Sequence, residues 1–151
     1  MAVKERSAES TEQALDNKNT VSRTVALVLG DVVVFLVFAA IGRRSHGEEA
    51  GLSAVLQVVT TAIPFLLGWF LVAPFIGAFR RDIQANPLKM VQRTALAWLA
   101  AWPVAMLLRG LLVDHAIPPW TFWLVAFISN TVFLQIWRLP YALIMKRSKR
   151  V

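Results

Sequence analysis

Residues 30–46, GDVVVFLVFAAIGRRSH, decide the fold because they combine an apolar run with charged residues that hydrocarbon does not hydrate. Extended back to residue 25, the run is long enough to cross a membrane. Asp31 lies inside it, and Arg43 and Arg44 follow it. An ionised carboxylate within a bilayer needs a partner, or it must become neutral. The rest of the chain must therefore supply a partner for Asp31, unless this side chain is protonated.

The composition indicates an integral membrane protein. Of the 151 residues, 57% are hydrophobic, and the mean hydropathy is +0.57. Soluble domains usually contain about 45–50% apolar residues. The excess comes from four segments, each long enough to span a bilayer: residues 25–41, 52–79, 95–113 and 120–145. We therefore predict an all-α membrane fold, a bundle of four transmembrane helices.

The polar segments divide the chain into three parts. Residues 1–22 mix both signs of charge without an apolar period, and we expect them to form a flexible polar tail. Residues 23–145 form the four-helix transmembrane domain, and residues 146–151 form a basic C-terminal end. The first apolar segment exceeds the core of a typical signal peptide and contains Asp31, so we expect an uncleaved first helix.

The basic residues predict the orientation in the membrane. Twelve of the sixteen Lys and Arg residues lie in the N-terminal tail, the second loop or the C-terminal end, whereas only Arg43 and Arg44 lie on the opposite side. Cytoplasmic loops carry the excess of positive charge. We therefore expect both termini to be cytoplasmic, in the inner membrane of a prokaryotic cell. The net charge of +7 follows this pattern and does not indicate nucleic-acid binding.

Prolines interrupt the apolar segments. Segment 52–79 contains Pro64 and Pro74 and is longer than one perpendicular crossing needs, so we expect kinks within it. Pro140 is expected to end or bend the fourth helix near Leu139. A basic connection, residues 80–93, is expected to separate the second and third spans.

Small residues predict where the helices approach each other. Ala97, Ala101 and Ala105 recur every four residues in the third span, a spacing that permits close helix contact. Pro64 and Gly68 lie on one face of the second span. We expect these five residues to pack between helices.

Polar residues of the fourth span are candidate partners for Asp31. Asn130, Gln135 and Arg138 share one broad face of that helix. Asp31 lies about 10 Å from the cytoplasmic end of its helix at 1.5 Å per residue, and Arg138 lies near the same end of its own. An Asp31–Arg138 pair, with Gln135 and Asn130 completing the hydrogen bonds, fits this depth. The alternative is that Arg138 extends to the headgroups and Asp31 is protonated.

A second charged group is expected at the outer side. Arg109 is close in depth to Arg43, Arg44, Asp114 and Glu48, and we expect an ion pair that anchors a loop, or a contact with lipid phosphate, in preference to a substrate site. His46 lies in the same motif. Its neighbouring glutamates do not have the spacing of a specific metal site, so we expect a solvated loop.

No catalytic arrangement emerges from the sequence. The chain has no cysteine, and its two histidines fall in predicted loops, which excludes ligation of a haem by two histidines from within the helices. A nucleophile with a base, or a cluster of metal ligands, is missing from the spans. We expect no enzymatic activity, no metal and no cofactor.

Three motifs resemble the domain-of-unknown-function family 3054, a prokaryotic group of small four-helix membrane proteins. They are DVVVFLVFAAIGRRSH at residues 31–46, PFLLGW at 64–69 and WPVAMLLR at 102–109, and the resemblance covers residues 23–138. It implies no activity. Its characteristic positions would be Asp31, Gly42, Arg43, Arg44, His46, Pro64, Trp69, Pro103 and Arg109.

These observations favour a non-enzymatic integral membrane protein that packs into a homo-oligomer or with other membrane-protein subunits. Its partners would then be the lipid bilayer and protein, without nucleic acid. The alternative is a small transporter or channel for an ion or small solute, using the polar network of Asp31, Asn130, Gln135 and Arg138.

Overall fold

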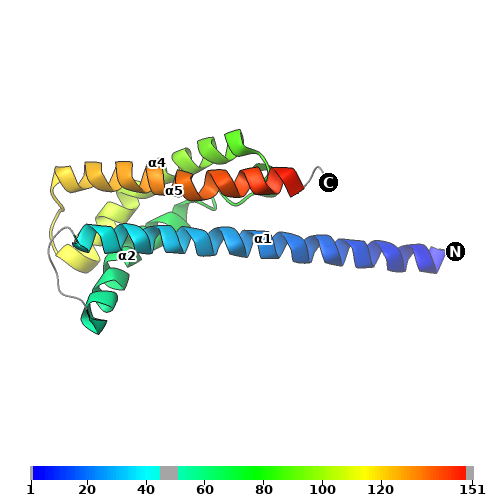
Figure 1. Cartoon of the computed structure of the whole chain (residues 1–151), viewed down its shortest axis with the longest axis horizontal. Helices are drawn as coiled ribbons and strands as arrows, with labels where there is room; N and C mark the ends of the chain where they lie inside the picture. The colour runs from blue at the N-terminus through cyan, green and yellow to red at the C-terminus, as the bar shows by residue number, and fades with distance from the viewer. Residues whose placement is uncertain (1, 45–50, 149–151) are drawn as a thin grey trace.

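The computed structural model describes residues 2–44 and 51–148, and these residues contain helices and turns but no strand. The helices are α1 (Ala2–Arg44), α2 (Leu52–Val72), α3 (Arg81–Gln84), α4 (Pro87–Arg109), the π-helical turn η1 (Gly110–Asp114) and α5 (Trp120–Ser148). Figure 1 shows α1 and α5 side by side, with α1 beginning and α5 ending at the same end of the bundle.

Four helical segments are long and apolar enough to cross a membrane: Gln13–Arg43, Leu52–Val72, Pro87–Asp114 and Trp120–Ser148. This confirms the prediction of an all-α chain with four candidate transmembrane helices.

The N-terminal segment is helical, although we expected residues 1–22 to be a flexible tail. α1 runs from Ala2 without interruption, so its 43 residues extend roughly 64 Å and project well beyond the bundle (Figure 1). Residues 2–29 contain neither glycine nor proline. The membrane helix also removes the cost of starting a new helix, so helical structure extends readily toward the N-terminus. Asp16 pairs with Arg81 at 3.0 Å, which connects the projection to α3.

The second span is shorter than expected. α2 ends at Val72, before Pro74, so Pro74 does not lie within the helix as segment 52–79 implied. A turn over residues 73–79 follows, in which Gly77 has a φ of 78°. The absence of an N–H on Pro74 and the left-handed backbone at Gly77 explain why the helix stops here.

The third span begins earlier than expected. α4 starts at Pro87, and the side chain of its N-cap residue Asn86 accepts a hydrogen bond from the Lys89 N–H. The anticipated connection 80–93 is therefore largely helical, divided between α3 and α4. A proline in the first turn lacks only an N–H that would have no partner there. In α5, Pro140 lies within the helix and does not end it.

The most extensive helix contact joins α2 to α4. Ala97, Ala101 and Ala105 are fully buried, and Pro64 and Gly68 are also buried. A Cβ atom added to Gly68 would lie 2.8 Å from the backbone nitrogen of Ala105, so only glycine permits this approach. The five residues expected at helix interfaces therefore lie inside the bundle. Aromatic side chains fill the adjoining core: Phe35, Phe65, Trp69 and Trp98.

Candidate functional site

A buried ion pair lies at the centre of the bundle, toward the end where α1 enters and α5 leaves. Arg138 of α5 donates from Nε to Asp31 Oδ1 at 2.9 Å and from Nη2 to Asp31 Oδ2 at 2.5 Å. Both side chains are 0% exposed. The planar guanidinium presents two parallel N–H groups to the two carboxylate oxygens, a geometry that a lysine does not reproduce.

Three further elements complete the hydrogen bonding of this pair. Trp69 of α2 donates its indole N–H to Asp31 Oδ2 at 3.0 Å. The Nη1 group of Arg138 donates to the Ala78 carbonyl at 2.9 Å and lies 3.4 Å from the Thr94 hydroxyl of α4. A buried ion pair stabilises a fold only when its other polar atoms are also satisfied. Here α1, α2, the 73–79 turn, α4 and α5 all contribute to one site.

Aromatic rings cover the guanidinium. The central carbon of Arg138 lies 4.8 Å from the ring centroids of both Trp69 and Phe79. The faces of aromatic rings attract cations, and the attraction increases when the cation is removed from water. The rings therefore replace part of the hydration that Arg138 loses.

Close contact between α1 and α5 brings the pair together. The Trp137 indole packs onto Gly30, where an added Cβ atom would lie 1.9 Å from the ring. The Trp137 N–H also reaches the Leu27 carbonyl at 3.4 Å. Since Gly30 precedes Asp31 and Trp137 precedes Arg138 in the sequence, the contact of the first pair positions the second.

Asn130 and Gln135 do not bond to either charged group, contrary to our expectation. Asn130 donates to the Ala126 carbonyl of its own helix, and Gln135 donates to the Val91 carbonyl of α4. Asn130 lies two turns, about 12 Å, along α5 from Arg138. Trp69, Thr94 and the Ala78 carbonyl occupy the positions that we expected these two amides to fill.

At the opposite end of the bundle, Arg109 forms the expected ion pair with Asp114. Its Nε and Nη2 groups donate to the two carboxylate oxygens at 2.9 and 3.1 Å, and its guanidinium lies 4.4 Å from the Phe122 ring centroid. Arg43 donates to the Gln57 side chain. Arg44 is the last residue of α1, and His46 lies outside the described residues.

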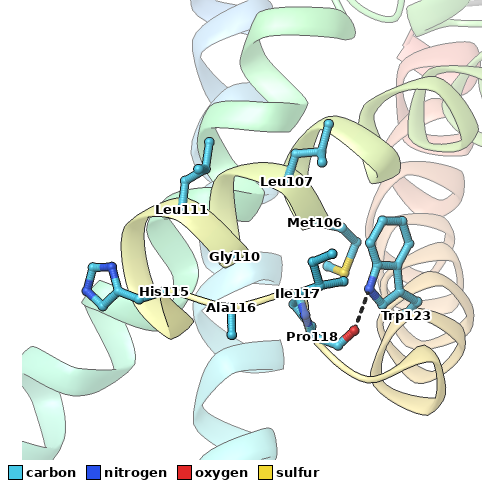
Figure 2. Close-up of a pocket in the computed structure, with 9 residues that line it drawn as sticks. All are labelled: Met106, Leu107, Gly110, Leu111, His115, Ala116, Ile117, Pro118 and Trp123. Atoms are coloured by element: carbon cyan, nitrogen blue, oxygen red, sulfur yellow. Dashed lines mark hydrogen bonds between the residues drawn. The ribbon is translucent and has the colours of Figure 1, made fainter.

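A pocket of about 390 Å³ lies beside this outer group. It is lined mostly by apolar residues of α4, η1 and the following loop, and Trp123 of α5 closes one side by donating to the Pro118 carbonyl at 3.0 Å (Figure 2). Figure 2 shows the His115 ring directed away from the other lining side chains. The pocket therefore lacks the convergent polar groups of a typical substrate site.

The site offers little for catalysis. Both oxygens of Asp31 accept hydrogen bonds, three in all, so the carboxylate is not presented as a general base. Across residues 2–44 and 51–148, no group of three or more His, Asp or Glu side chains is placed to hold a metal ion.

Sequence reasoning located Asp31 and Arg138 but missed most of their partners. Trp69 was named only through the family resemblance, and Thr94 gave no signal because it lies between the expected connection, residues 80–93, and the expected third span, residues 95–113. The Ala78 carbonyl is a backbone group, and its role depends on the turn that ends α2.

A family model described as a protein of unknown function, DUF3054, matches residues 28–141. The match includes both members of the buried pair and excludes the projecting part of α1. No curated protein and no solved structure matches the chain.

Proposed function

Because the chain belongs to the DUF3054 family, whose function is unknown, we propose a function from the geometry of its buried pair. The protein is a non-enzymatic, multi-pass membrane protein that packs as a rigid subunit into a homo-oligomer or a larger membrane assembly. Its termini are cytoplasmic, and it resides in the inner membrane of a prokaryotic cell. The charge asymmetry of the sequence supports this orientation.

The observation that carries the proposal is the complete enclosure of Asp31 and Arg138. A group that moves ions or protons must reach water on alternate sides of the membrane. This pair is instead 0% exposed and is held by donors and acceptors from four helices and one turn. Such an arrangement fixes the relative positions of the helices, which is what a structural subunit requires.

The projecting half of α1 supports an assembly role. Side chains from residue 13 to residue 19 are exposed, and Asp16 is bonded to Arg81 across the gap to α3. A mainly polar helix that projects beyond its own bundle can bridge to another domain or chain. We therefore expect the partner to contact this surface.

Cysteine crosslinking tests the assembly directly, since the chain has no native cysteine. Asn17→Cys places a thiol on the projection, and Ser53→Cys places one at the far end of the bundle as a matched control. Oxidation in native membranes should crosslink the Asn17→Cys protein to a second copy or another protein, more than the control. A solubilised particle that contains one chain and no other protein, without crosslinks, would contradict the proposal.

One observation favours the transporter alternative. The side-chain oxygens of Asn130 and Gln135 are buried and have no hydrogen-bond partner among the described residues. Unsatisfied buried acceptors are costly and often mark a bound water or a ligand. A row of such groups along α5 would begin a polar path that leads toward Arg138.

A flux measurement separates the two functions. Vesicles reconstituted with the full chain and loaded with a pH-sensitive dye should show no proton flux above that of empty vesicles. Flux that is present in the natural chain and absent in Asn130→Leu would favour transport and overturn the structural assignment.

A further inference from the structure

An apolar groove follows the seam between α1 and α5. It has a volume of about 580 Å³, and its lining residues come from these two helices alone, with Ala26, Val33 and Val37 on one side and Phe133, Ile136 and Trp137 on the other. From Ala26 to Val37 it extends about 16 Å at 1.5 Å per residue. This length equals roughly half of the 30 Å hydrocarbon core of a bilayer.

The cytoplasmic end of the groove is cationic. Arg23 lies one turn before Ala26, and its backbone carbonyl accepts a hydrogen bond from the Tyr141 hydroxyl of α5 at 2.7 Å. Lys146 and Arg147 lie in the last turn of α5. Within these two helices no acidic residue offsets the charges, since α5 has none and α1 has none between Asp16 and Asp31.

We propose that this groove binds one anionic phospholipid of the inner leaflet, with an acyl chain along α1 and α5 and the phosphate at Arg23. The apolar length matches one leaflet, and the charge lies where the headgroup would be. A second copy of the chain fits less well. Two copies in one membrane share their orientation, so their Arg23 and Lys146 side chains would meet at the same depth and repel.

Lipid titration of the full chain in detergent tests the proposal. Palmitoyl-oleoyl phosphatidylglycerol should bind with a stoichiometry of one per chain and about fivefold more tightly than the phosphatidylcholine with the same acyl chains, as expected for one basic residue acting at a membrane surface. Thermal stability and native mass spectrometry both report this binding.

Two matched pairs of variants locate the site. Arg23→Gln should abolish the preference for phosphatidylglycerol, whereas Lys18→Gln, which removes the same charge from the projection of α1, should retain it. Val33→Phe fills the groove and should weaken both lipids, whereas Val25→Phe, at an exposed valine outside the lining, should weaken neither. Both valines are exposed, so the bundle should fold in each variant.

Any one of four results would overturn the proposal. Equal affinity for the two lipids would remove the role of charge. Equal losses in Arg23→Gln and Lys18→Gln would reduce the effect to general attraction by a basic surface. Unchanged lipid binding in Val33→Phe, or a dimer that this substitution dissociates, would show that lipid does not occupy the groove.

Discussion

Arg138 connects more of the chain than any other described side chain. Its N–H groups reach α1 through Asp31, the 73–79 turn through Ala78 and α4 through Thr94, while its backbone belongs to α5. The guanidinium also lies 4.8 Å from the ring centroid of Trp69 in α2. One residue therefore sets the relative positions of most of the bundle.

The stability of the bundle should depend on the two-pronged geometry of the Arg138 guanidinium and not on its charge alone. Arg138→Lys keeps the charge but loses the paired bonds to Asp31 and the bond to Ala78. Hydrogen bonds to charged groups contribute about 1.5–3 kcal/mol each, so we expect a loss of at least about 2 kcal/mol in the free energy of unfolding in detergent. Arg93→Lys, at an exposed arginine that bonds the Ile76 carbonyl, should change it by less than about 0.5 kcal/mol. Equal losses of stability in Arg138→Lys and Arg93→Lys would argue against a specific role for the guanidinium geometry of Arg138.

Gly30 should tolerate no side chain. In Gly30→Ala the new methyl group would overlap the Trp137 ring, move α5 away from α1 and lengthen the Asp31–Arg138 contact. Overpacking of this kind costs about 1–3 kcal/mol, so the thermal unfolding temperature should fall. Gly42→Ala is the control in the same helix, because nothing lies within 4 Å of the added Cβ. A fall of the same size in the control would contradict the role of close packing at Gly30.

At this scale the sequence left the pair as one of two alternatives, the other being a protonated Asp31, and it did not predict the surroundings of the pair. An ionised Asp31 within hydrocarbon requires a partner, and Arg138 is a suitable cation because it lies near the same end of its own helix. Helical periodicity does not reveal which neighbouring helix faces a polar group. We therefore expected Asn130 and Gln135 to complete the hydrogen bonds of the pair. Trp69 and Thr94, which belong to other helices, form these bonds instead.

Among the elements, the position at which α2 ends matters most, because it determines where the 73–79 turn lies relative to Arg138. Hydropathy alone extends the second span to residue 79, because the 73–79 turn is as apolar as the helix before it. The turn directs the Ala78 carbonyl to Arg138, which satisfies a backbone acceptor at a depth where water is scarce. Pro74 and Gly77 end α2 locally, whereas the bond between the following turn and Arg138 is a tertiary contact that the local sequence does not reveal.

The α2–α4 contact should be sensitive to side-chain volume. Ala101→Leu adds three carbon atoms to a fully buried position in the alanine row, and we expect a loss of about 1–3 kcal/mol in the free energy of unfolding. Val104→Leu, which adds one carbon at a half-buried position of the same helix, should cost less. Equal stability of the two variants in a thermal unfolding experiment would indicate that the alanine row does not pack tightly.

For the whole molecule, the four candidate spans were predictable because each needs about 20 apolar residues, a strong signal. The helical projection of α1 was not predictable, because the polar composition of residues 1–22 is equally compatible with a flexible chain. Its helical form depends on continuity with the membrane segment of α1. Orientation follows from charge and remains a prediction.

Reporter fusions test this orientation. A fusion after residue 151 or between residues 84 and 87 should be active only with a reporter that functions in the cytoplasm, and a fusion at residues 45–50 only with one that functions outside it. The twelve-to-two distribution of basic residues provides the physical reason. A reporter fused after residue 151 that is active outside the cytoplasm would contradict the predicted orientation.

The central claim is that the Asp31–Arg138 pair holds the bundle together, and a double-mutant cycle tests it most directly. Asp31→Asn or Arg138→Gln alone leaves the other charge buried and should lower the free energy of unfolding by up to about 3–5 kcal/mol. The double variant replaces the ion pair with two neutral amides and should recover much of either loss. Additive losses, with no recovery in the double variant, would show that the two charges do not depend on each other and would contradict this account.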